Sequence, residues 1–190
     1  MKADKTLGIT CRTEEQDAAI EPPLGSVGCM VEVVAVQGLP DGRSNIVCLG
    51  KSRYRTMRYI EGEPYLQAEV TPFDDELGGE GEDLGHRAES VGRLFQRALK
   101  AAQSMRELTS RQDAETPELP PDPQGLSFIV ASTLEIKLED KQELLEMTNT
   151  GDRLRRLGAL LKDVAPEYER RASLHHLSRR NGHAGELPSE

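Results

Sequence analysis

The hydrophobic pattern of this chain changes its period once, and the change divides the sequence into two parts. Before residue 74, apolar residues recur at every second position, as they do in Val27–Gln37, which is the pattern of a β-strand with one buried face. From residue 84 they recur every three to four residues, the spacing of an amphipathic helix. The sequence therefore predicts an α+β fold with a β-rich lobe at 1–73, an acidic, glycine-rich loop at 74–83 and a helical lobe at 84–178.

The β-rich lobe is expected to contain five short strands, at Leu7–Cys11, Val27–Gln37, Asn45–Gly50, Arg53–Tyr59 and Tyr65–Val70. The second should place one set of residues on a single face: Val27, Cys29, Val31, Val33 and Ala35. Asp41-Gly42 tolerates the positive φ angles of a tight turn, so it should join the second strand to the third. In the last strand, Leu66, Ala68 and Val70 should face inward. Short strands with tight turns indicate a small barrel or a strongly curved sheet.

The helical lobe begins with an apolar stripe at helical spacing: Val91, Leu94, Phe95, Ala98, Leu99, Ala102, Met105 and Leu108. A proline-rich linker follows at 110–124, and further helices are expected from Leu126, around Asp140–Met147 and from Asn149. Asn149 and Asp152 have the spacing of a capping pair. Pro166 should kink or interrupt the last helix, and the tail at 179–190 should be disordered.

Composition excludes several classes of protein. The formal net charge of −9 argues against a general nucleic-acid binder, because contacts to phosphates need a basic surface. The three cysteines, Cys11, Cys29 and Cys48, are odd in number and lie in apolar runs, so they are interpreted as reduced packing residues. Because no apolar run has the length of a signal peptide or a membrane span, a cytoplasmic protein is expected.

No motif in the chain indicates an enzyme. Gly50-Lys51-Ser52 matches the end of a phosphate-binding loop, but the full motif needs a glycine at the position of Asn45 and a helix after it. Here a strand is expected to follow, so the three residues are interpreted as a turn between strands. The four histidines, His86, His175, His176 and His183, form no metal-ligand spacing with a cysteine. The prediction is a non-catalytic protein without a cofactor or a metal.

One strand is both basic and aromatic. Alternation along Arg53–Tyr59 should send Arg53, Arg55, Met57 and Tyr59 to the outer face, where they could grip an extended peptide or stack on bases. A solvated strand face is the plainer interpretation of the same pattern. These four residues are the candidate peptide-binding site.

Three stretches together resemble the N-terminal, substrate-recognition domain of Lon-type ATP-dependent proteases. The first is Pro23–Gly28 with the strand that follows, the second runs from Leu39 to Gly50 and continues through Arg53–Arg55 and Pro64–Val70, and the third is Lys141–Glu146 followed by Asp152–Leu154. The resemblance spans about residues 6 to 165. It implies a PUA-like β pseudobarrel followed by a helical bundle, in a stand-alone protein of bacterial type that lacks the ATPase and peptidase modules.

The resemblance implies a module that binds unfolded or extended protein segments, in protein quality control. Two alternatives remain open: an RNA-binding PUA-like module, and an adaptor that acts in trans on a full-length Lon-type protease. Family members usually begin with further strands before the one that matches Leu7–Cys11. A barrel that is incomplete at its N-terminus has unpaired strand edges, so poor solubility or an edge-mediated homodimer is expected.

Overall fold

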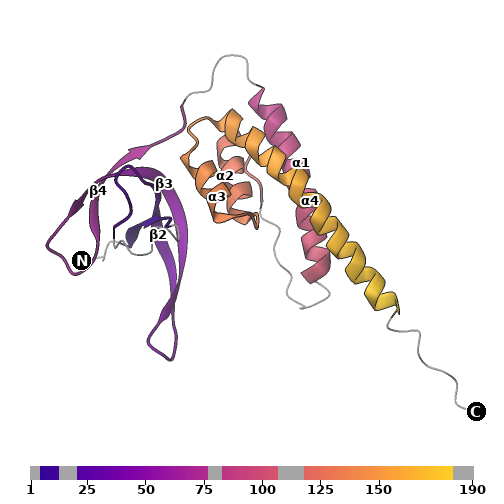
Figure 1. The fold of residues 1–190 in the computed structure, drawn as a ribbon, viewed down its shortest axis with the longest axis horizontal. Coiled ribbons are helices and arrows are strands. Elements are labelled where there is room, and N and C mark those ends of the chain that lie inside the picture. The colour runs from indigo at the N-terminus through magenta and orange to yellow at the C-terminus, as the bar shows by residue number, and fades with distance from the viewer. Residues whose placement is uncertain (1–4, 13–20, 77–82, 107–117, 182–190) are drawn as a thin grey trace, which may run out of the picture. The chain divides into compact units, whose positions relative to one another are not determined.

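The computed structural model describes residues 5–12, 21–76, 83–106 and 118–181, which fall into two compact units. Unit 1 comprises the residues up to Asp75 together with Leu138–Thr148, and unit 2 comprises Glu76–Lys137 and the residues from Asn149 onward. The described residues form four strands and four helices (Figure 1), so the prediction of an α+β fold is confirmed.

Unit 1 is built on an open antiparallel sheet with the order β1-β2-β3-β4. Its strands are β1 (Thr6–Thr10), β2 (Val27–Gly38), β3 (Ser44–Ile60) and β4 (Gln67–Phe73). The long hairpin of β2 and β3 bends along its length (Figure 1). Each strand pairs with its neighbour in the sequence, so every connection within the sheet is local.

The turn between β2 and β3 lies where the sequence predicts it. Gly42 has a φ of 85°, which favours glycine, and the amide of Leu39 donates to the carbonyl of Arg43 at 2.7 Å. The carboxylate of Asp41 accepts a hydrogen bond from the amide of Arg43 at 3.1 Å. An aspartate that bonds to the main chain two residues ahead stabilises a turn, so this prediction is confirmed.

The two strands predicted at Asn45–Gly50 and Arg53–Tyr59 are a single strand, β3. Gly50-Lys51-Ser52 was expected to form a turn between them, and this expectation is wrong. The strand continues through these residues with one bulge. Met30 pairs with Ser52 and Val31 pairs with Gly50, so Lys51 has no partner residue in β2. Lys51 forms an ion pair with Glu32 of β2, with 2.7 Å between their charged atoms.

Two further bulges break the simple alternation of side chains. In β2 the pairing shifts between Val33 and Ala35, so the predicted apolar face ends at Val33 and the side chain of Ala35 is exposed. In the pairing of β3 with β4, the shift lies between Thr56 and Arg58, which leaves Met57 without a partner residue in β4. A bulge moves every later side chain of its strand to the other face. A prediction that assigns side chains to faces by counting every second residue is therefore wrong beyond a bulge.

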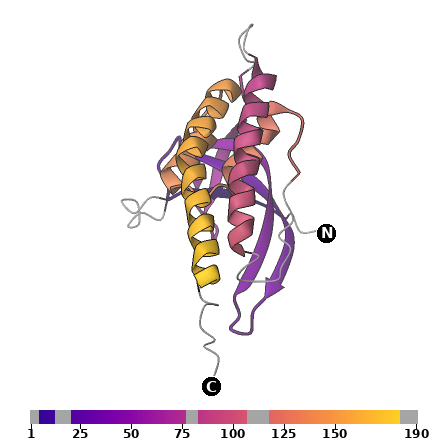
Figure 2. The ribbon, with the colours of Figure 1, turned by 90° about the vertical axis from the view of Figure 1, so that its right-hand side faces the viewer.

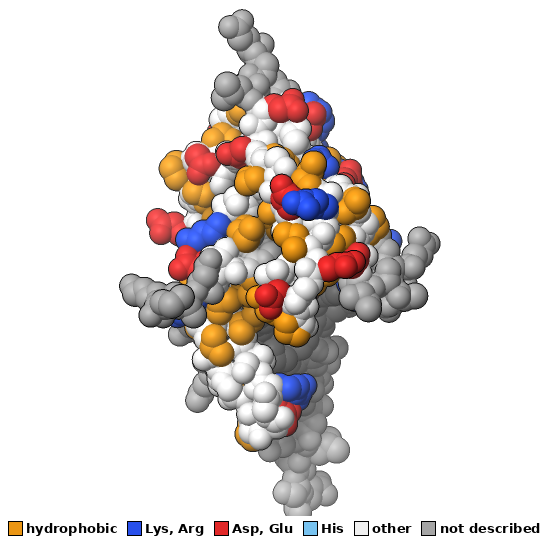
Figure 3. Space-filling view, turned by 90° about the vertical axis from the view of Figure 1, so that its left-hand side faces the viewer, with side chains coloured by type: hydrophobic (Ala, Val, Ile, Leu, Met, Phe, Trp, Pro, Cys, Tyr) orange, Lys and Arg blue, Asp and Glu red, His pale blue; other side chains and the backbone are white. Residues whose placement is uncertain are grey.

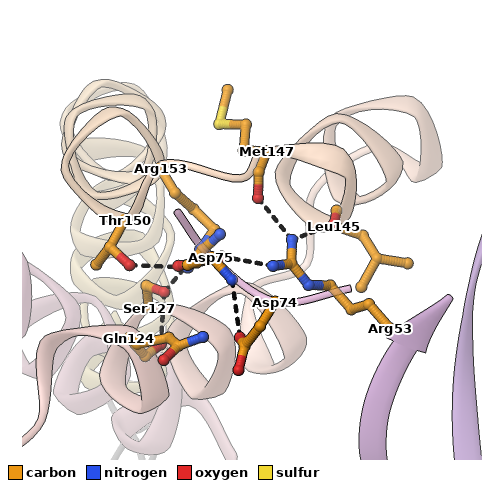
Figure 4. A network of polar contacts seen from close by, with 9 residues as sticks. All are labelled: Arg53, Asp74, Asp75, Gln124, Ser127, Leu145, Met147, Thr150 and Arg153. Carbon is orange, nitrogen blue, oxygen red and sulfur yellow. Dashed lines mark hydrogen bonds and ion pairs between the residues drawn. The ribbon is translucent and has the colours of Figure 1, made fainter. Parts of the chain in front are cut away.

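Helix α3 (Leu138–Glu146) belongs to unit 1, whereas the sequence placed residues 84–178 in one helical lobe. The guanidinium of Arg53 in β3 donates to the carbonyls of Leu145 at 2.9 Å and Met147 at 2.6 Å (Figure 4). Helix α3 has no basic residue in its last turn, so Arg53 supplies the cation that the negative end of the helix favours. The side-chain amide of Gln142 also donates to the carbonyl of Val27 at 3.1 Å. Contacts far apart in sequence therefore hold this helix on the sheet.

Unit 2 consists of α1 (Leu84–Arg106), α2 (Pro123–Thr133) and α4 (Thr150–Asn181). Helices α1 and α4 lie side by side (Figures 1 and 2). The core contains Val91, Phe95 and Ala98 of the predicted stripe, and it is completed by apolar residues of α2 and α4, among them Leu126, Val130, Leu154, Leu157 and Leu161. The end of the stripe, Leu108, lies outside the described residues.

The ends of the helices in unit 2 follow local signals. Asp122 caps α2 by accepting from the amide of Gly125 at 2.6 Å, and Pro123 occupies the first turn, so the linker ends two residues earlier than predicted. Asn149 accepts from the amide of Asp152 at 2.9 Å, as predicted for a capping residue. Of the two effects expected at Pro166, a kink or an interruption, the interruption is wrong, because α4 continues to Asn181. Pro166 is exposed, where water can bind the carbonyl that loses its helical partner. The disordered tail was predicted from residue 179, but residues 179–181 are the last residues of α4. The rest of the predicted tail, 182–190, lies outside the described residues.

Candidate functional site

One face of the sheet of unit 1 contains a pocket of about 320 Å³. This volume is at the small end of the range for ligand pockets. All four strands contribute to the lining, which combines aliphatic side chains with hydroxyl groups: Gly8, Thr10, Arg12, Pro22, Met30, Tyr54, Thr56, Tyr59, Leu66, Ala68 and Val70. The inward set that alternation predicts for the last strand, Leu66, Ala68 and Val70, lines this pocket.

The floor of the pocket depends on a row of three residues across three strands. Thr10 of β1 pairs with Gly28 of β2, and Gly28 pairs with Tyr54 of β3. Because Gly28 has no side chain, the ring of Tyr54 can lie over it and reach Thr10, with 2.7 Å between the two hydroxyl oxygens. A Cβ atom at Gly28 would lie 2.4 Å from Cζ of Tyr54, and one at Gly8 would lie 2.7 Å from its hydroxyl. Both positions therefore require glycine for close packing.

Tyr59 lies on the pocket side of the sheet. It pairs with Ala68 of β4, and Thr56 pairs with Val70 of β4. Because Ala68 and Val70 both line the pocket, their partners Tyr59 and Thr56 lie on the same face. Its hydroxyl donates to the carbonyl of Pro22 at 2.7 Å. Burial raises the pKa of Tyr59, and the negative charge of Glu21 raises it further. The phenol is thus held neutral as a hydrogen-bond donor at the edge of the pocket.

The four residues predicted from alternation do not share one outer face. Arg53 is buried, with 6% of its side chain exposed, and it forms an ion pair with the equally buried Asp75 at 2.5 Å (Figure 4). Arg55 is exposed, and its guanidinium lies 5.1 Å from the ring centre of Phe73. Met57 is 55% exposed at the bulge, whereas Tyr59 lines the pocket. Arg53 is therefore a structural residue, and Tyr59 is the one of the four that the pocket includes.

Sequence reasoning missed Thr10, Gly28 and Tyr54 as a unit. A signal for them existed, because a glycine inside a strand often marks a place where another group approaches closely. To identify Tyr54 as the approaching residue, one needs the register that pairs it with Gly28. This register cannot be obtained by counting residues back from the turn, because the bulge at Lys51 shifts the pairing by one residue.

Among the described residues, the exposed large apolar side chains are all in unit 1. Figure 3 shows hydrophobic side chains on the described surface of this part of the molecule, with charged groups between them. The thirteen exposed large apolar residues are Leu7, Ile9, Leu24, Val34, Val36, Ile46, Val47, Leu49, Met57, Ile60, Tyr65, Leu66 and Leu138, and all of them belong to unit 1. Unit 1 thus has the apolar surface of the described residues, and the corresponding side chains of unit 2 are covered.

Within the part of the chain that the structure describes, two further features are absent. No group of three or more His, Cys, Asp or Glu residues in the described ranges could hold a metal ion. No helix within those ranges is both long and apolar enough to cross a membrane.

The chain is similar in sequence to part of several known proteins. The chain is 29% identical to the Lon protease of Brevibacillus choshinensis over 160 residues, which is 82% of this chain and 20% of the relative. It is 30% identical to the Lon protease of Solibacter usitatus over 167 residues, 85% of this chain and 20% of that relative. This chain thus spans about a fifth of the length of the curated relatives it matches.

A solved structure has the same fold. The N-terminal domain of the Lon protease of the Mycobacterium avium complex matches with a TM-score of 0.57 and 17% identity, covering 83% of this chain and 90% of that domain. The family model described as the ATP-dependent protease La (LON) substrate-binding domain matches residues 1–163. The chain therefore belongs to the family of Lon substrate-binding domains.

Proposed function

We propose that this chain is a non-catalytic binding module that holds extended segments of other proteins at the pocket of unit 1. The observation that carries the proposal is that the pocket lies in the same unit as every exposed large apolar side chain of the described residues. Membership in the family of Lon substrate-binding domains supports the same class of ligand.

The lining of the pocket suits a polypeptide. Met30, Leu66 and Val70 offer apolar surface to a side chain. The hydroxyl of Thr10 is half-buried and already bonds to Tyr54, but a hydroxyl can take part in more than one hydrogen bond, so it can also bond to a main chain. An extended segment presents alternating side chains and main-chain groups, so it can use both kinds of contact at once.

The charges of unit 1 favour a protein ligand over RNA. Within the basic strand, Arg53 is buried against Asp75, and Arg58 forms an ion pair with Glu69 of β4. The strand therefore presents less positive charge than its sequence indicates, while the chain carries a net charge of −9. Binding to phosphates depends on uncompensated positive charge.

A direct binding measurement tests the proposal. A fluorescently labelled protein that is kept unfolded by reduction and alkylation should raise its anisotropy when the chain is added, and its folded parent should not. Because the contacts are mainly apolar, the affinity should change little between low and high salt. An absence of binding by the folded chain, or binding of single-stranded RNA that weakens steeply with salt, would overturn the proposal.

A Lon-type protease is a second proposed partner, because the matched relatives are Lon proteases of which this chain corresponds to about a fifth. In this role the chain would act in trans, in quality control of cytoplasmic proteins. Addition of the chain to a purified Lon protease should change the rate at which that protease degrades an unfolded substrate. An unchanged rate at a saturating concentration of the chain would reject the adaptor role. It would not affect the proposal that the chain binds unfolded protein.

A further inference from the structure

The two outer strands of the sheet differ in how their edges are protected. The edge of a sheet presents main-chain N–H and C=O groups that can pair with another strand, and proline or charged residues discourage such pairing. Strand β4 contains both Pro72 and the exposed Glu69. Strand β1, Thr6–Thr10, contains neither a proline nor a charged residue. Of the two outer strands, β1 is thus the one whose sequence does not discourage pairing with another strand.

The main chain of β1 is oriented for such pairing. The carbonyl of Lys5 accepts from the amide of Val33 in β2 at 2.8 Å, so the main-chain groups of Lys5 point toward β2. In an antiparallel ladder this direction alternates from residue to residue. The main-chain groups of Leu7 and Ile9 therefore face β2, and those of Gly8 and Thr10 face the outer edge. Within the described ranges, no strand pairs with that edge.

The sequence of β1 is symmetric around Gly8. The order Thr-Leu-Gly-Ile-Thr has the same classes of residue in both directions. If two copies pair antiparallel with a two-fold axis at Gly8, Leu7 of one copy lies opposite Ile9 of the other, and Thr6 lies opposite Thr10. Aliphatic pairs and threonine pairs both stabilise adjacent strands, and no like charges would face each other. A contact with two-fold symmetry needs such a self-complementary surface.

We propose that two copies of this chain associate through antiparallel pairing of their β1 strands, centred on Gly8. Leu7 is 38% exposed and Ile9 is 48% exposed, so both side chains are available to the partner strand. The two-fold axis of such a pair is perpendicular to the sheet, which keeps the pocket faces of both copies on the same side. Gly8 and Thr10 line the pocket, so the two pockets would share one continuous sheet face.

Charge substitutions in the full chain test this pairing and its register. Leu7→Glu should abolish the dimer in sedimentation velocity, because it places a carboxylate opposite Ile9 of the partner, and Leu7→Glu with Ile9→Glu should also give a monomer. Leu7→Glu combined with Ile9→Lys should restore the dimer, because each glutamate then faces a lysine of the other copy. Val36→Glu is the matched control, since Val36 is 66% exposed on the hairpin and should leave the dimer intact.

Circular dichroism and thermal melting must show that each variant is folded before its mass is interpreted. The net charge of −9 on each copy predicts a tighter dimer at higher salt, because salt screens the repulsion between copies. A monomeric unsubstituted chain at every concentration tested would overturn the proposal. So would a folded Leu7→Glu, Ile9→Lys variant that stays monomeric, or loss of the dimer in Val36→Glu.

Discussion

The hydroxyl of Tyr54 lies 2.7 Å from Oγ1 of Thr10, although β2 separates the strands of the two residues. The contact is possible because the residue between them in the ladder is Gly28, over which the ring of Tyr54 lies. This one arrangement links three strands and builds the floor of the pocket. It also makes the pocket sensitive to a single added methyl group.

Gly28→Ala should lower the free energy of unfolding by roughly 1–3 kcal/mol, the usual cost of overpacking. The added Cβ would lie 2.4 Å from Tyr54 and 2.6 Å from the carbonyl oxygen of Ile9, so the ring would have to move. Urea denaturation followed by circular dichroism measures the loss. Gly38→Ala is the control, because a Cβ there has no neighbour within 4 Å. Equal effects of the two substitutions would contradict the packing described for Tyr54.

The class of fold was predicted well from the sequence, because the signals that determine it are local. The change of period near residue 74, the turn at Asp41-Gly42 and the cap at Asn149 each depend on residues that are close together in the chain. All three are confirmed by the structure. The placement of α3 in unit 1 was not predictable in this way, because it depends on Arg53 and Gln142 reaching partners about a hundred residues away.

The candidate site was predicted less well because alternation fails at a bulge. Met57 and Tyr59 were assigned to the face of Arg53 and Arg55 by counting every second residue. The structure inserts an unpaired residue at Met57, and from there the count is shifted by one. Burial of Arg53 was also not visible in the sequence, since its partner Asp75 lies in a segment without periodicity.

Arg53→Met should destabilise the protein by about 3–5 kcal/mol, because it leaves the carboxylate of Asp75 buried without this cation and removes the cap of α3. Thermal and urea denaturation measure the change. Arg58→Met is the matched control in the same strand, because its ion pair with Glu69 is exposed and should contribute less than about 1 kcal/mol. A loss of similar size in both variants would show that Arg53 does not have the structural role assigned to it.

Tyr59→Phe should make the stability of the protein less dependent on alkaline pH. The folded state raises the pKa of Tyr59 above its usual value of 10.0, mainly by burial, so the unfolded state loses this proton first. The stabilisation is therefore complete below pH 10 and is lost as the pH rises through the higher pKa of the folded state. Urea denaturation at about pH 9 and about pH 11 should show a smaller loss in the variant than in the unsubstituted chain. Identical losses would contradict the raised pKa of this phenol.

Two neighbouring residues, Tyr65 and Leu66, allow a direct test of whether the pocket face of unit 1 binds extended protein segments. Leu66 and Tyr65 are both well exposed, at 50% and 61%, but among the two only Leu66 lines the pocket. Leu66→Glu and Tyr65→Glu therefore add the same charge to adjacent positions at a similar exposure. The measurement is the anisotropy of a labelled, permanently unfolded protein titrated with each folded variant. We predict that Leu66→Glu weakens binding at least about tenfold, the equivalent of about 1.4 kcal/mol, and that Tyr65→Glu binds like the unsubstituted chain. Equal affinities for the two variants, or a greater loss in Tyr65→Glu, would contradict binding of extended segments at the pocket.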